Sequence, residues 1–111
     1  MFSFIPKYET LTEVLLDQKL AKLGDAYVNF LYSLVLSKIL ADAFKKAGLR
    51  KFLPSRINRH KQADAAEALI VYAWIQGQMN MEEGLEILEK NEDNIEAFSL
   101  LLLSAKSKSK L

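Results

Sequence analysis

The sequence predicts an all-α protein. Apolar residues recur at intervals of three and four through most of the chain, which is the period of a helix with one buried face. Prolines stand only at positions 6 and 54, so long stretches contain no helix-breaking residue. No segment shows the strict alternation typical of a half-buried strand. With 111 residues, 50% of them hydrophobic, the chain fits one domain over residues 1–111 with one modest core.

The first expected helix opens at "TLTE", where Thr10 and Glu13 are placed as a capping box. Its apolar repeats continue, as one long helix or two in series, to "KKAGL", where Gly48 is a natural C-terminal stop. A turn is expected around Pro54, because proline disfavours helix in the residue before it.

Three further helices follow, which brings the expected total to about five. The next begins near Gln62 and reaches Gly77, and its centre is apolar on nearly every side. A short amphipathic helix is expected over 80–90 and a last one over 94–106. Residues 105–111 are basic, and we expect them to form a mobile tail.

Composition excludes several classes of protein. Fifteen basic residues balance fourteen acidic ones, so the net charge of +1 gives no overall case for nucleic acid or membrane binding. With no cysteine and a single histidine, disulfides, thiolate metal sites and histidine-rich zinc sites are excluded or disfavoured. The start lacks the pattern of a signal peptide, and the most apolar stretch, Ala26–Leu36, is too short to span a bilayer. We therefore expect a soluble cytoplasmic protein that binds no membrane.

Three acidic residues stand among small and apolar neighbours. Asp64 and Glu67 are three residues apart, so on a helix they share one face. Asp25 follows Gly24 inside an otherwise apolar helix, where both residues are poor helix formers. Carboxylates at such spacing repel each other unless a proton or a cation compensates, and they suit Mg²⁺ or Mn²⁺. A solvated helix face carries the same pattern, so the residues alone leave both interpretations open.

Two segments resemble the motifs of ribonuclease III. "KLGDAYVNFL" resembles the signature helix of that family, with its leucine–glycine–aspartate–alanine core. "QADAAEALIVYAWIQGQMNMEEGLEIL" is similar to the second motif, in which aspartate, two spacers, glutamate and an apolar helix lead into a glycine turn. "LADAFKKAGLRKFL" resembles the intervening helix that ends in a glycine–leucine turn.

The resemblance implies a ribonuclease III-like helical endonuclease domain that cleaves double-stranded or structured RNA with Mg²⁺ or Mn²⁺. It makes Asp25, Asp64 and Glu67 the catalytic, metal-binding carboxylates. It also implies a homodimer. The apolar excess of "ALIVYAWI" and "FSLLLLSA" independently favours contact with another subunit.

The segment "GLRKFLPSRINRHK" carries a cluster of basic residues: Arg50, Lys51, Arg56, Arg59, His60 and Lys61. Such a cluster is able to neutralise RNA phosphates beside an acidic site, and it also fits a solvated loop and helix start. Given the resemblance, we expect these six residues to bind the RNA backbone.

The sequence departs from the family pattern at several positions. Ala21 occupies the acidic position four residues before the aspartate, as in the mini-ribonuclease III branch, and Gln18 occupies the acidic position three further back. Lys22 replaces an aromatic residue that lies near the partner subunit in the family. The stretch between the motifs is shorter by a helix, and we expect no double-stranded-RNA-binding domain. The alternatives are an inactive RNA-binding or assembly module of the same fold, and a helical partner-binding protein with solvated acids.

Overall fold

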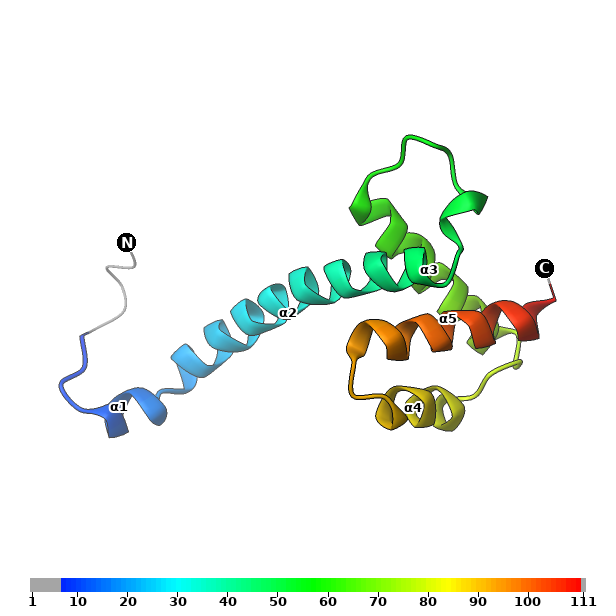
Figure 1. Cartoon of the computed structure of the whole chain (residues 1–111). Coiled ribbons are helices and arrows are strands. Elements are labelled where there is room, and N and C mark those ends of the chain that lie inside the picture. The colour runs from blue at the N-terminus through cyan, green and yellow to red at the C-terminus, as the bar shows by residue number, and fades with distance from the viewer. Residues whose placement is uncertain (1–6, 111) are drawn as a thin grey trace. The chain divides into compact units, whose positions relative to one another are not determined.

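The protein is built of helices. The structure, a computed structural model, describes residues 7–110, and these contain five α-helices, one 3₁₀ turn and no strand (Figure 1). The helices are α1 (Leu11–Leu15), α2 (Gln18–Lys46), α3 (Arg59–Ile75), α4 (Met81–Lys90) and α5 (Asn94–Ser109), and the turn is Arg50–Phe52. The all-α prediction is confirmed. The chain divides into two compact units, residues 1–33 and residues 34–111, which are described separately.

The described part of the first unit holds two helices in series. Thr10 caps α1, because its hydroxyl accepts a hydrogen bond from the backbone N–H of Glu13 at 3.3 Å. α1 ends after five residues. Asp17 then accepts hydrogen bonds from the backbone N–H groups of Lys19 and Leu20 at 2.8 and 3.0 Å, which is the contact of a helix N-cap. The sequence is compatible with one long helix or with two in series, and the structure has two.

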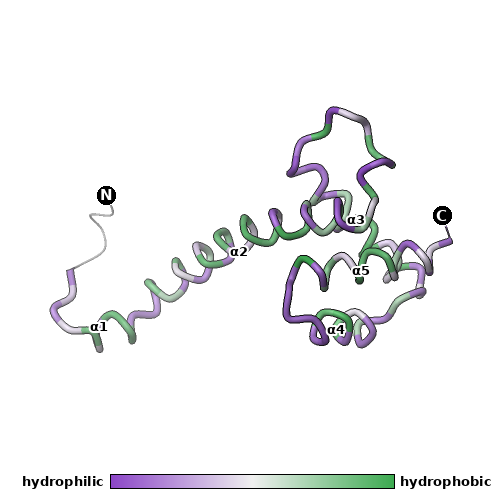
Figure 2. Tube along the Cα trace, viewed as in Figure 1, coloured by the Kyte–Doolittle hydropathy of each residue, from purple (hydrophilic) through white to green (hydrophobic). Residues whose placement is uncertain are grey.

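Apolar residues recur along α2 (Figure 2), and the side chains of many of them are exposed. The exposed ones are Leu23, Tyr27, Val28, Phe30, Leu31, Tyr32, Leu34 and Val35. The helix has 29 residues and is long and apolar enough to cross a membrane by length and composition alone. The apolar stretch judged too short from sequence is therefore part of a longer helix that passes this test. A core helix of a soluble protein passes it too, so the finding is weak evidence for a membrane span.

The core of the second unit is built largely of alanines. Ala63 and Ala66 of α3 are at most 1% exposed, and they pack in one cluster with Leu40 and Phe44 of α2 and Leu102 of α5. Small side chains let helix backbones approach closely, so α3 is held by its alanine face. The opposite face of α3 is left available for polar groups.

α5 packs against both α3 and α4 (Figure 1). Leu101 and Ala105 bury against Ala73 of α3 and against Met79, which lies in the turn after Gly77. The leucine-rich segment of α5 therefore contributes to the core of this unit. The structure differs from the expected mobile tail over residues 105–109, where α5 remains helical and the Lys108 ammonium pairs with Glu83 of α4.

Candidate functional site

α3 presents two of the three predicted acidic residues on its exposed surface. The helix begins after Asn58, whose side-chain oxygen accepts a hydrogen bond from the Lys61 backbone N–H at 2.8 Å. Asp64 and Glu67 follow one turn apart, and both are exposed. Ala63 and Ala66 on the buried face fix the rotation of the helix, and this rotation turns both carboxylates away from the core.

Neither carboxylate is neutralised by a lysine or an arginine among the described residues. Asp64 has the His60 imidazole as its nearest basic group, with Nε2 to Oδ2 at 3.9 Å, and its side chain is 60% exposed. Glu67 forms no ion pair in this part of the chain. Two uncompensated carboxylates on one helix face form a local centre of negative charge that is able to receive a cation.

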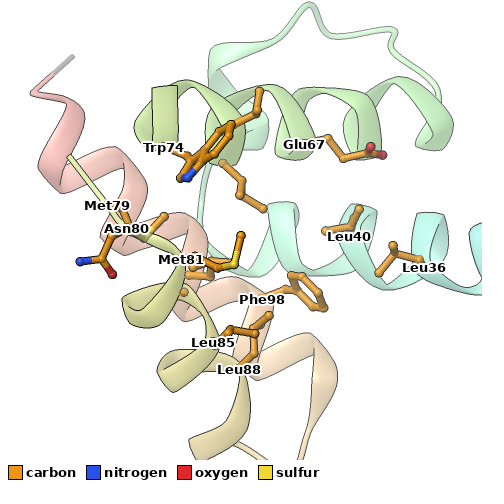
Figure 3. A pocket seen from close by; sticks show the side chains of 14 residues that line it. Leu36, Leu40, Glu67, Trp74, Met79, Asn80, Met81, Leu85, Leu88 and Phe98 are labelled. Carbon is orange, nitrogen blue, oxygen red and sulfur yellow. The ribbon is translucent and has the colours of Figure 1, made fainter. Parts of the chain in front are cut away.

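Glu67 also lies at one end of an apolar cavity of about 470 Å³ (Figure 3). The cavity lies among the end of α2, α3, α4 and α5, and its lining includes Leu40, Trp74, Met81 and Phe98. Trp74 is 54% exposed, so this ring is not part of the core that one copy of the chain forms.

Asp25 lies on α2 in the first unit. It is exposed, and its Oδ1 accepts a hydrogen bond from Asn29 Nδ2 at 3.4 Å, one turn further along the helix. Within its own unit, a Cβ added at Gly24 would meet no heavy atom within 4 Å. This unit alone therefore contains no helix that packs closely against Gly24.

The described residues hold no group of three histidine, aspartate or glutamate side chains that is able to bind a metal ion. Asp64 and Glu67 come together on α3, whereas Asp25 belongs to the other unit. The three-carboxylate site therefore stays a prediction, with two of its members on a common face.

Two of the six predicted RNA-binding residues already hold the fold together. The Arg50 guanidinium donates to the backbone carbonyls of Pro54 and Ser55 at 2.9 and 2.7 Å, which fixes the loop before α3. Arg59 pairs with Asp42 of α2 at 2.5 Å and so joins the two helices. No local pattern predicts this ion pair, because its members are seventeen residues apart.

Three other residues of the basic cluster are free of such structural contacts in the described part of the chain. Arg56, His60 and Lys61 are exposed, and neither Arg56 nor Lys61 forms an ion pair within residues 7–110.

The Lys51 ammonium lies 5.5 Å from the centre of the Phe52 ring. Lys106 of α5 lies at the same distance from that ring. Sequence reasoning missed Lys106, because it is distant from the cluster along the chain.

These features place the protein among all-helical domains that carry an exposed acidic helix face beside a basic turn. A family model described as Ribonuclease III matches residues 18–102, which is most of the chain, so the protein belongs to the ribonuclease III family. The match begins at the first residue of α2 and includes all three predicted acids and the whole basic cluster. No curated protein and no solved structure matches the chain.

Proposed function

We propose that the protein is a metal-dependent endoribonuclease that cleaves double-stranded or structured RNA. The observation that carries the proposal is the pair of exposed, uncompensated carboxylates on α3, Asp64 and Glu67, in a member of the ribonuclease III family. Asp25 is the third proposed catalytic and metal-binding residue.

The donor set fits Mg²⁺ or Mn²⁺. Both are hard cations that bind few carboxylates and retain several waters, so two residues on one helix face and one further acid suffice. When bound, the ion supplies a water of lowered pKa and offsets charge on the scissile phosphate. Asp64 and Glu67 hold the ion on the exposed face of α3, and the alanine face of the same helix keeps them fixed in the fold.

The basic cluster holds the RNA backbone next to this face. Arg56 and Lys61 have no anionic partner in the described chain, and Lys61 stands in the first turn of α3, as does Arg59. Basic residues in the first turn oppose the helix dipole, and α3 has no acidic residue there to compensate. Contact with phosphate explains why such an unfavourable arrangement exists.

We propose a cytoplasmic homodimer. The exposed apolar side chains of α2 and the half-exposed Trp74 need a cover, and a second copy of the chain provides one. A membrane is the alternative cover, since α2 passes the length and composition test. Asp25 and Asn29, both exposed on the same helix, favour the protein partner, because a charged group in hydrocarbon is costly.

Incubation of the purified protein with labelled duplex RNA tests the proposed activity. We expect internal cleavage with Mg²⁺ or Mn²⁺, none with EDTA, and restoration when metal is returned in excess. Single-stranded RNA of the same sequence is the control, and it should be cut much less.

A second candidate function rests on one residue. Ala21 stands where the wider family carries an acid, and it is exposed on α2. If that acid is essential, the protein is an inactive RNA-binding or assembly module. Duplex binding without cleavage at any Mn²⁺ concentration would support this candidate, and Ala21→Glu should then create activity.

A further inference from the structure

Phe52 is an aromatic ring that the core does not use. It belongs to the segment "LRKFL", in which Leu49 is buried and Leu53 packs against the core. The 3₁₀ turn Arg50–Phe52 places the Phe52 side chain outside, where 62% of the residue is exposed. An exposed phenylalanine between two leucines that pack inward has no evident structural role in a single copy of the chain.

Two ammonium groups lie over this ring. The Nζ atoms of Lys51 and Lys106 are each 5.5 Å from the ring centre, within the range of a cation–π contact. Lys51 precedes the ring on the 3₁₀ turn, whereas Lys106 comes from α5, so two separate elements deliver positive charge to one aromatic side chain.

A small apolar cavity adjoins the ring. It has a volume of about 260 Å³, and its lining includes Phe44, Leu49, Phe52, Leu53 and Lys106. Its lining contains no acidic residue, and Lys106 is its one charged member. The cavity is below the usual size range of a drug-sized ligand site, so a single flat group is the occupant that suits it.

We propose that Phe52, with Lys51 and Lys106, binds one unpaired nucleotide of an RNA. The base stacks on an exposed face of the Phe52 ring, where it displaces the ammonium groups, and these then contact the phosphates on either side. An aromatic ring combined with positive charge is how proteins hold single-stranded nucleic acid without reading its sequence. The inference rests on the RNA binding proposed above and adds a separate contact to it.

The nucleotide must be unpaired. In an A-form duplex the faces of the bases are stacked and hidden, so a protein ring reaches them only in tails, loops and bulges. The charge argues against an apolar protein segment as the occupant, because such a segment would leave the two ammonium groups without an anionic partner. The proposed RNA is therefore a duplex that carries a single-stranded tail or loop.

Binding of three matched RNAs in EDTA, where no cleavage occurs, tests this site. The first is a blunt duplex, the second is the same duplex with an unpaired adenosine tail, and the third has an abasic tail of equal length. We expect the wild type to bind the adenosine tail more tightly than the abasic tail. Loss of one stacked base weakens binding by about 5- to 150-fold.

Substitutions at Phe52 distinguish stacking from simple apolar contact. Phe52→Leu retains an apolar side chain and the fold but removes the flat ring, so it should lose the preference for the adenosine tail and bind blunt duplex as before. Phe52→Trp should retain the preference. Lys106→Gln should weaken the binding of both tailed RNAs equally. Lys110→Gln, a control at a described residue outside the site, should leave the binding of both unchanged.

Several results would overturn the proposal. Equal affinity of the wild type for adenosine and abasic tails would do so, as would a Phe52→Leu variant that keeps the preference. A changed sedimentation coefficient of Phe52→Leu would assign the ring to a protein contact instead. Absence of RNA cleavage by a wild type that still prefers the adenosine tail would contradict the proposed activity and leave this site standing.

Discussion

Arg56 and Arg59 stand three residues apart, and their surroundings differ. Arg59 is neutralised by Asp42, whereas Arg56 and the nearby Lys61 form no ion pair within the described residues. A guanidinium that already has a carboxylate partner gains less from a phosphate than one that does not. Proximity in the sequence therefore overstates how similar their functions are.

The combined Arg56→Ala and Lys61→Ala substitutions should weaken the binding of unrelated RNA duplexes equally. Each lost phosphate contact should reduce the slope of log affinity against log salt by roughly one unit. Arg59→Ala should change the slope less and lower the stability by at most about 1 kcal/mol, the range for an exposed ion pair. Titration at several salt concentrations gives the slopes. An unchanged slope in the double variant would show that Arg56 and Lys61 contact no phosphate.

The Glu83–Lys108 pair should make stability depend on pH. The hydrogen bond from Lys108 holds the pKa of Glu83 below its ordinary value of 4.5. Because this pKa is lower in the folded state, the contribution is present above about pH 4.5 and is lost as pH falls below that value. Thermal melts of the wild type and Glu83→Gln should therefore differ at pH 7 and converge in acid. A constant difference down to pH 3 would contradict the pairing.

At the scale of helices, local sequence patterns predict where the helices lie, but they do not predict the ion pairs between helices. The capping pattern of "TLTE", the stop at Gly48 and the helix before Gly77 could all be predicted, because caps and apolar spacing are local properties. The sequence does not decide between one helix and a break at Asp17, since an N-cap inside an apolar repeat carries a weak signal. The helical end of α5 could not be predicted from local sequence, because Glu83, its partner, lies in another helix.

The candidate site shows the same division. The spacing of Asp64 and Glu67 predicts their common face, and α3 bears this out. Their relation to Asp25 depends on how distant segments of the chain come together, which local spacing does not encode. Arg50 fixes the loop through two backbone carbonyls. Every residue has a backbone carbonyl, so the amino-acid sequence does not show which carbonyls Arg50 contacts.

Two glycine substitutions, one in the turn before α4 and one within α4, should change the stability in opposite directions. Gly77 has a φ of +71°, a left-handed conformation that costs an L-residue about 1–2 kcal/mol, so Gly77→Ala should lower the stability. Gly84 lies within α4, and a Cβ there would meet only Leu101 Cδ1 at an ordinary 3.9 Å. Gly84→Ala should raise the stability by about 0.5–1 kcal/mol. Denaturant unfolding measures both, and the same sign for both would contradict this geometry.

For the whole molecule, the exposed apolar residues of α2 predict a dimer. Sedimentation equilibrium without detergent should give twice the chain mass of 12.6 kDa. Phe30→Glu places a charge among the exposed apolar side chains and should shift the protein toward monomer, whereas Lys19→Glu, near the start of the helix, should not. A wild type that is monomeric at micromolar concentration, or that stays in solution only with detergent, would contradict the dimer.

Single-turnover cleavage of a labelled RNA duplex by acid variants tests the proposed catalytic role most directly. Glu67→Gln and Asp25→Asn keep the side-chain volume and remove one charge each. Metal-ion stabilisation of charge is worth several kcal/mol and each ~1.4 kcal/mol is tenfold in rate, so both variants should be slower by about 100-fold or more. Glu89→Gln, an exposed glutamate on α4, is the matched control and should cleave normally. Wild-type rates for Glu67→Gln and Asp25→Asn, in a preparation whose wild type cleaves only with Mg²⁺ or Mn²⁺, would show that these carboxylates are not the catalytic site.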